Sequence, residues 1–211
     1  MDIPNIILLS GAICAGKSTI AKWLEQSFAF KHIKTSKLLS RRSRYQAPTR
    51  KQLQNLGERL DRNEPDWLLK DFSSVCPYDS QTRYVVDSIR IYEQAILFRN
   101  AFGRNIVHIH IEAPPDTLRT RFETRRAQCG YEPINYDSVK ESKTERNIDT
   151  LKNDADISIN THRCREEDVQ IRVAGLLGLY SYTQTKNIDV IIGGQFGSEG
   201  KGNVVAYLSP E

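Results

Sequence analysis

The sequence predicts an α/β protein with a parallel sheet flanked by helices. Short apolar segments alternate along the chain with longer helical ones, which is typical of β–α units that place parallel strands side by side. The first apolar segment, residues 5–9, leads directly into a glycine-containing loop and a helix. The other expected strands are residues 31–35, 83–87, 105–112 and 156–160.

The glycine-containing loop reads GAICAGKST over residues 11–19 and has the P-loop spacing. At this spacing successive backbone N–H groups surround a phosphate, and the helix that begins at Lys17 adds its positive end. Lys17 can reach the β- and γ-phosphates, while the Ser18 hydroxyl can ligate Mg²⁺. We therefore predict ATP and Mg²⁺ as cofactors. The predicted nucleotide-binding residues are Gly11, Ala12, Cys14, Ala15, Gly16, Lys17, Ser18 and Thr19. The alternative is an ordinary turn, but strand, complete motif and helix are all in register.

Length and composition limit the class of protein. The 211 residues exceed a usual domain of about 100 to 150 residues, so we expect one sizeable core and an appendage. The 30 Lys and Arg exceed the 26 Asp and Glu by only +4, too little to indicate a duplex-binding surface. The four cysteines form no CxxC pair, and neither a signal peptide nor a membrane span is evident. We expect a reduced, cytoplasmic protein with small nucleotide ligands, no zinc site and no membrane partner. A nucleic-acid partner is disfavoured, and a homodimer is left open.

The third expected strand ends in a carboxylate, Asp87. Ligands of open α/β sheets bind at the carboxyl edge of the strands, so Asp87 can hold Mg²⁺ or orient the attacking group. The alternative is that Asp87 caps the next helix, since Asp87 and Ser88 are both good N-cap residues. We favour the metal role because the P-loop meets the same edge of the sheet.

Arginines crowd residues 119–126. Planar guanidinium groups suit the negative charge that phosphoryl transfer spreads over the phosphate oxygens. Arg121 and Arg125 are four residues apart, on one helical face, and we predict that they are catalytic. Arg119 is equally compatible with a solvated helix face.

Other segments complete the first domain. Pro114 and Pro115 end the fourth strand and can open the next helix. His108 and His110 share one face of that strand and, without a third metal ligand, are expected to be core or edge residues. Residues 165–182 have an apolar helical face that should pack on the sheet. That face carries Val169, Val173, Leu176, Leu177 and Tyr180.

Residues 5–165 resemble the nucleoside monophosphate kinase group, and most of all its dephospho-CoA kinase and deoxynucleoside monophosphate kinase branch. The resemblance rests on the P-loop, the arginine-rich segment and three further stretches: PTRKQLQNLGERL (48–60) followed by Trp67, VVDSIR with Glu93 (85–93), and ERNIDTLKNDADISIN (145–160). It implies a P-loop NTPase-type fold whose mobile lid carries arginines like Arg121 and Arg125. It also implies that Arg50 and Arg90 bind the acceptor monophosphate.

The chain departs from this group near the end of the second strand. Kinases of this type often carry an Asp there that aligns or deprotonates the acceptor, whereas this chain has Ser36 and Lys37. A cation cannot accept the acceptor's proton, so we expect weak kinase activity. The alternative is a nucleotide-binding module that has lost turnover.

Residues 184–211 are expected to start a second domain after a kinase-like domain over residues 1–183. The segment IDVIIGGQFGSEGKGNVVAYL (188–208) joins an apolar strand to a glycine-rich turn and a helix, but its spacing is not that of a second P-loop. It resembles the N-terminus of adenylosuccinate synthetase, which uses GTP to activate a purine 6-oxygen. The residues of this motif are Gln195, Ser198, Gly200 and Lys201, with Ser198 in the place of the family's Asp. About twenty residues cannot bury a core alone, so we expect a longer fusion.

The predicted function is ATP- and Mg²⁺-dependent phosphoryl transfer to a purine (deoxy)nucleoside monophosphate, in a protein fused to an adenylosuccinate synthetase-like unit. The choice of a purine depends on the second motif alone.

Overall fold

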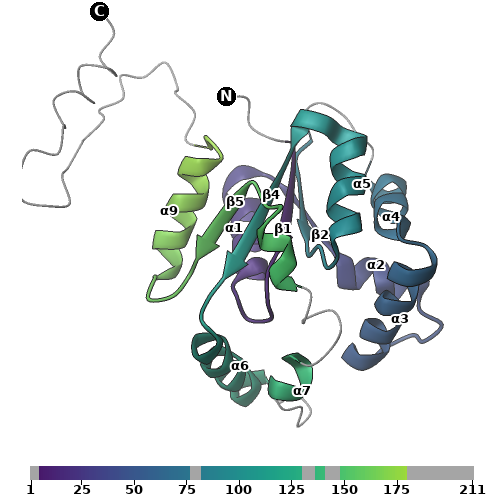
Figure 1. The fold of residues 1–211 in the computed structure, drawn as a ribbon, viewed down its shortest axis with the longest axis horizontal. Helices are drawn as coiled ribbons and strands as arrows, with labels where there is room; N and C mark the ends of the chain where they lie inside the picture. The colour runs from purple at the N-terminus through teal and green to yellow at the C-terminus, as the bar shows by residue number, and fades with distance from the viewer. Residues whose placement is uncertain (1–4, 77–81, 130–135, 141–147, 180–211) are drawn as a thin grey trace, which may run out of the picture. The chain divides into compact units, whose positions relative to one another are not determined.

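The computed structural model describes residues 5–76, 82–129, 136–140 and 148–179. Within them, parallel strands form one sheet in the spatial order β2-β3-β1-β4-β5 (Figure 1). The strands are β1 (Ile6–Ser10), β2 (Lys31–Lys34), β3 (Tyr84–Asp87), β4 (Ile106–Glu112) and β5 (Ile157–Asn160). The predicted parallel sheet is confirmed, and each strand end lies within one residue of its expected position.

Helices cover both faces of the sheet (Figure 1). The longer ones are α1 (Lys17–Phe28), α2 (Thr35–Arg42), α3 (Arg50–Asn63), α4 (Trp67–Val75), α5 (Tyr92–Phe102), α6 (Pro115–Cys129) and α9 (Glu166–Leu176). The shorter ones are α7 (Tyr136–Lys140) and the 3₁₀ helices η1 (Gly103–Asn105) and η2 (Ile148–Lys152). α6 begins at Pro115 as predicted, because a missing N–H is harmless in the first turn. No described helix is long and apolar enough to cross a membrane.

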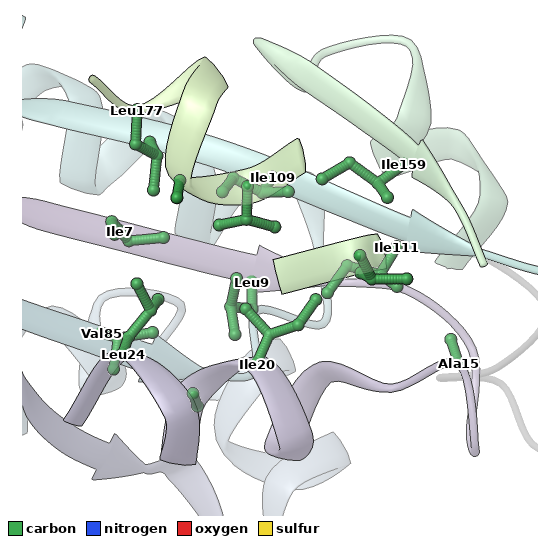
Figure 2. Packing of buried hydrophobic residues seen from close by; sticks show 14 of the residues in the cluster. Ile7, Leu9, Ala15, Ile20, Leu24, Val85, Ile109, Ile111, Ile159 and Leu177 are labelled. Carbon is green, nitrogen blue, oxygen red and sulfur yellow. The ribbon is translucent and has the colours of Figure 1, made fainter. Parts of the chain in front are cut away.

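Two hydrophobic cores form because successive strand residues point to opposite faces of the sheet. One core packs the strands against α1 and α9 (Figure 2). Its strand residues are Ile7, Leu9, Val85, Ile109, Ile111 and Ile159. The other core packs the strands against α2, α4 and α5. Its main side chains are Ile6, Leu8, Tyr84, Val86, Leu39, Trp67, Leu68, Phe72 and Phe98.

The helix expected over residues 165–182 is shorter in the structure. Val169, Val173 and Leu177 are buried as predicted, but Leu176 is 58% exposed, so the prediction for that residue was wrong. At about 100° per residue, the buried side of α9 centres on Val173 and Leu177, which leaves Leu176 at its edge. Leu176 is also the last residue of the helix.

His108 and His110 are core residues, as predicted. Each is at most 1% exposed, and Ser10 Oγ lies 2.7 Å from His108 Nε2 and 2.9 Å from His110 Nδ1. Burial lowers the pKa of His108 from 6.5 to about 4, and the nearby charge of Arg99 adds to this effect. The His108 ring is therefore neutral at pH 7.

Acid destabilisation is expected to depend on His108. His108 binds a proton near pH 6.5 in the unfolded chain and near pH 4 in the folded protein. The free energy of unfolding therefore keeps its full value above pH 6.5 and decreases as the pH falls from 6.5 to 4. The loss is on the order of 3 kcal/mol. Urea unfolding from pH 7 to pH 4 measures it. His108→Leu should flatten this pH dependence, whereas the exposed-site control His162→Gln should keep it; an unchanged slope in His108→Leu would contradict the assignment.

Gly11 joins β1 to the following loop where no other residue fits. Its φ is +132°, and a Cβ there would overlap the carbonyl oxygen of Ile111 in β4. We expect Gly11→Ala to lower the free energy of unfolding by about 3 kcal/mol or more, from strain and steric overlap together. Gly103→Ala is the control, because Gly103 also has a positive φ but has open space around it. Equal losses in the two variants, measured by urea unfolding, would show that the close approach to Ile111 is unimportant.

Candidate nucleotide-binding site

The loop over residues 11–16 connects β1 to α1 at the carboxyl edge of the sheet. Gly11, Cys14 and Gly16 have positive φ angles, which turn the backbone sharply. Residues with positive φ between residues with negative φ turn successive backbone N–H groups into one concavity, which suits an anion. Apart from Gly16 and its neighbours in the chain, no heavy atom of the described residues lies within 4 Å of the position that a Gly16 Cβ would take. The loop is thus open at the N-terminus of α1, where a phosphate gains from the helix dipole.

Lys17, the first residue of α1, lies against the loop. Its Nζ donates to the carbonyl oxygens of Gly11 (2.7 Å) and Ala12 (2.8 Å). Its charge also acts on Asp87 and helps to lower the pKa of that carboxyl group. The ammonium group therefore stands between the phosphate loop and the acidic end of β3.

Asp87 forms the acidic part of the site. Ser18 Oγ donates to Asp87 Oδ2 over 2.7 Å, and His32 Nε2 lies 3.3 Å from the same oxygen. Burial opposes ionisation of Asp87, but the hydrogen bonds from His32 and Ser18 and the charge of Lys17 outweigh it, so its pKa is lowered from 3.8. Asp87 is an ionised acceptor at neutral pH.

The helix-capping alternative for Asp87 is wrong. The residue at the N-cap of α5 is Ile91, and within the described residues no side-chain hydrogen bond caps that helix. The carboxylate instead accepts a hydrogen bond from Ser18 Oγ.

The Ser18–Asp87 pair fits a magnesium ion. Mg²⁺ prefers oxygen ligands and commonly takes one or two protein groups together with phosphate oxygens and water. In the described part of the chain, no group of three or more His, Cys, Asp and Glu could hold a metal ion. Ser18 and Asp87 are the side chains that could hold Mg²⁺ together with phosphate oxygens and water.

The two predicted catalytic arginines of α6 lie in different surroundings. Arg121 donates to Thr161 Oγ1 (2.9 Å) and to the Thr161 carbonyl (2.8 Å), with a longer contact to the Cys14 carbonyl (3.5 Å). Arg125 is exposed, and its positive charge opposes the rise in the pKa of the Cys14 thiol that burial causes. Arg121 thus ties α6 to the segment after β5, whereas Arg125 stands at the phosphate loop. Arg119 pairs with Asp137 of α7 at 2.7 Å on the surface.

Arg50 and Arg90 lie in two different parts of the fold, Arg50 at the start of α3 and Arg90 between β3 and α5. Arg50 is the exposed first residue of α3, and its charge acts on the Cys14 thiol. Arg90 follows β3, and its backbone N–H donates to Gln94 Oε1 over 3.0 Å. Burial raises the pKa of the Cys14 thiol, while the charges of Arg125, Lys17 and Arg50 oppose this. The charges of three predicted site cations therefore act on one loop residue.

The end of β2 carries cations and hydroxyl groups. Thr35 is buried and donates to the Ser88 carbonyl over 3.0 Å. Ser36 and Lys37 follow it on the first turn of α2 and are exposed. Ser36 and Lys37, where the sequence departs from the resembled kinases, thus follow β2, and β2 pairs with β3, the strand that carries Asp87.

Sequence reasoning missed His32. Its side chain is 2% exposed and contacts Asp87 because β2 pairs with β3 in a register that places Lys34 opposite Asp87. Alternation puts His32 and Lys34 on the same face of β2. The alternation could have been read from the sequence, but the pairing of β2 with β3 could not.

Residues 7–135 match the family described as AAA domain. The match spans more than half of the sequence. This protein belongs to the AAA domain family. No curated protein matches the sequence significantly. The synthetase-like residues Gln195, Ser198, Gly200 and Lys201 lie outside the described residues, as does Tyr180.

Solved structures share the fold of this AAA domain. The YorR protein of Bacillus subtilis, solved in complex with phosphorylated GDP, has a TM-score of 0.53 and 16% identity, covering 83% of this chain and 96% of its own. Shikimate kinase of Aquifex aeolicus vf5 has a TM-score of 0.51 and 20% identity, covering 83% and 98%. A gluconokinase of Sinorhizobium meliloti 1021 has a TM-score of 0.51 and 13% identity, covering 86% and 100%. At such identities the similarity establishes the fold, which is that of the P-loop kinases.

Proposed function

We propose that this AAA domain transfers the γ-phosphoryl group of ATP to a purine (deoxy)nucleoside monophosphate. The observation that carries the proposal is the meeting of Lys17, Ser18 and Asp87 at the open phosphate loop. A lysine, a hydroxyl and an ionised carboxylate at this edge are the groups that ATP with Mg²⁺ requires.

Each side chain has a distinct task in this reaction. The loop N–H groups and Lys17 bind the β- and γ-phosphates, and Ser18 and Asp87 hold the metal. Mg²⁺, when bound, neutralises charge on the β- and γ-phosphate oxygens. An oxygen of the acceptor phosphate attacks the γ-phosphorus, and the bond to the β–γ bridging oxygen breaks. ADP leaves, the acceptor becomes a diphosphate, and Arg125 stabilises the transferred group.

The positive charge of the residues predicted to bind the acceptor supports an anionic acceptor. Besides Arg50 and Arg90, Lys34 is the last residue of β2 and Lys37 lies in the first turn of α2. A phosphate monoester offers oxygens for bidentate binding by guanidinium groups, which a neutral alcohol lacks. The nucleotide named with the YorR structure supports a nucleotide ligand, and the synthetase-like motif of residues 188–208 supports a purine. We further propose that residues 184–211 begin a second, synthetase-like domain.

A nucleotide-binding module is the second candidate, favoured by one observation. The resemblance to the nucleoside monophosphate kinase group implies a carboxylate near the end of β2, where this chain has Ser36 and Lys37. Phosphoryl transfer relies more on positioning than on base strength, so the kinase proposal predicts slow turnover rather than none.

ADP release distinguishes these functions. The protein would be mixed with ATP, Mg²⁺ and one acceptor at a time: AMP, GMP, dAMP, dGMP, CMP, dTMP, shikimate or gluconate. The proposal predicts ADP release with at least one purine monophosphate above the acceptor-free rate. Release with shikimate or gluconate alone would contradict the proposed acceptor, and nucleotide binding without release would favour the module.

Replacing Arg50 or Arg90 with Ala should chiefly raise the acceptor KM, because these residues bind the acceptor in both ground and transition states. Loss of one bidentate contact costs about 2 to 3 kcal/mol. Arg125→Ala should instead chiefly lower kcat. Arg62→Ala, an exposed position on α3, is the control. Steady-state kinetics measure both constants, and the reverse pattern would exchange the assigned roles.

A further inference from the structure

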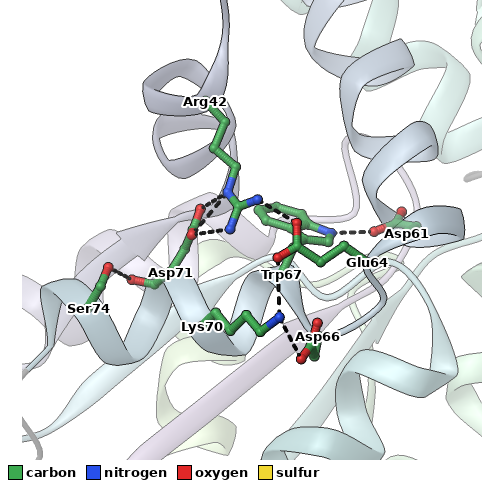
Figure 3. Close-up of polar contacts among 8 residues, drawn as sticks. All are labelled: Arg42, Asp61, Glu64, Asp66, Trp67, Lys70, Asp71 and Ser74. Atoms are coloured by element: carbon green, nitrogen blue, oxygen red, sulfur yellow. Dashed lines mark hydrogen bonds and ion pairs between the residues drawn. The ribbon is translucent and has the colours of Figure 1, made fainter.

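The backbone of Arg90 belongs to a set of partly buried hydrogen bonds. Its backbone N–H donates to Gln94 Oε1 (3.0 Å), and Gln94 Nε2 donates to Asp61 Oδ1 (2.8 Å). Trp67 Nε1 donates to the same Asp61 oxygen over 2.7 Å (Figure 3). Gln94 is 1% exposed, so water competes little for these bonds. The segment after β3 is thereby fixed to α3 and α4.

A glycine of α3 makes room for the Arg90 side chain. Gly57 is buried in the middle of the helix, and a Cβ there would lie 3.2 Å from Arg90 Nη1 and 3.4 Å from Leu39 Cδ1. Glycine destabilises a helix interior relative to alanine. At this position its absent side chain leaves the space beside the Arg90 guanidinium.

Asp61 adds a negative charge near the same guanidinium. Burial raises the pKa of Asp61, while the hydrogen bond from Trp67 and the charge of Arg90 oppose that rise. Arg90 is the cation whose charge acts on Asp61. The carboxylate is oriented by its two neutral donors, Trp67 and Gln94, and it attracts Arg90 toward α3.

We propose that Gly57, Asp61 and Gln94 are positioning residues that hold the Arg90 guanidinium in place for a phosphate monoester. The inference rests on the proposed function for the nature of the acceptor. A guanidinium that is already oriented loses less side-chain freedom when it binds two phosphate oxygens. We name Gly57, Asp61 and Gln94 the Arg90 seat.

Gly57→Ala tests the seat with a matched control in the same chain. Gly175→Ala also replaces a helical glycine, in α9, but the space around Gly175 is open. Both variants gain helix propensity, so both should keep or slightly raise the wild-type Tm. Only Gly57→Ala displaces Arg90. Calorimetric titration with AMP, GMP, dGMP and inorganic phosphate should show affinity for the monophosphates reduced about tenfold in Gly57→Ala and unchanged in Gly175→Ala.

Asp61→Asn is the second variant. It keeps an oxygen that accepts from Trp67 and Gln94 but removes the charge that attracts Arg90. We expect weaker monophosphate binding with unchanged ATP affinity. A purely structural role for Asp61 would lower Tm and both affinities together.

The possible outcomes distinguish a failure of the Arg90 seat proposal from a failure of the proposed phosphoryl transfer. Wild-type protein that binds a monophosphate but transfers no phosphoryl group contradicts the proposed function and leaves the seat intact. Transfer by wild type, with Gly57→Ala binding monophosphates as Gly175→Ala does, overturns the seat alone. Wild-type protein that binds none of the four probes overturns the seat as well, because Arg90 then serves no phosphate ligand.

Discussion

Lys17→Ala is expected to lower the rate of phosphoryl transfer by about 10³-fold and to weaken ATP binding, while the domain stays folded. Lys17 Nζ donates to the Gly11 and Ala12 carbonyls and stands near Asp87. The substitution therefore removes the only positive charge that α1 places against the loop backbone in the described structure. Loss of a partly exposed charge of this kind affects the hydrophobic core little.

The control for this prediction is Lys22→Ala, which removes an exposed lysine from the same helix. Nucleotide affinity is measured by calorimetry, the rate by ADP release, and folding by thermal denaturation. A folded Lys17→Ala protein with the affinity and rate of Lys22→Ala would show that the loop does not bind the transferred phosphate.

Asp87→Asn is expected to lower the rate by about 10²-fold or more and to raise the Mg²⁺ concentration needed for half-maximal rate. The amide keeps an oxygen for Ser18 but loses the charge that attracts the metal ion. Because the pKa of Asp87 is lowered from 3.8, the wild-type carboxylate stays ionised at and above pH 5. Its stabilising interactions are present above its unfolded pKa and are lost only as the pH falls through the lowered folded pKa.

Asp154→Asn provides the comparison, since Asp154 is an exposed acidic residue away from the P-loop. Magnesium titrations of the transfer rate at constant ATP distinguish the two variants. If Asp87→Asn requires no more Mg²⁺ than Asp154→Asn, the carboxylate has another role, such as orienting His32.

Local sequence patterns predicted the loop between β1 and α1 because its conformation is set locally. The spacing of Gly11 and Gly16 and the helix that begins at Lys17 are set within a few consecutive residues. Asp87 was predictable as well, since the carboxyl ends of parallel strands share an edge. The strands themselves follow from short apolar runs between helices.

Features that depend on packing between distant segments were not predictable. The contact of His32 with Asp87 requires the pairing of β2 with β3, and the space beside Gly57 requires the approach of Arg90 to α3. The spacing of Arg121 and Arg125 placed both on one helical face, but only the structure shows that Arg121 is bound to Thr161. The spacing of charged residues identifies a helical face, but it does not identify the groups that this face contacts.

Single-turnover transfer of the γ-phosphoryl group tests the central claim most directly. Protein in excess of radiolabelled ATP would be mixed with Mg²⁺ and each purine monophosphate, for wild type and Lys37→Asp. The account predicts slow appearance of labelled purine diphosphate with wild type. No transfer by wild type to any purine or pyrimidine monophosphate, with transfer restored by Lys37→Asp, would contradict it and leave the domain as a nucleotide-binding module.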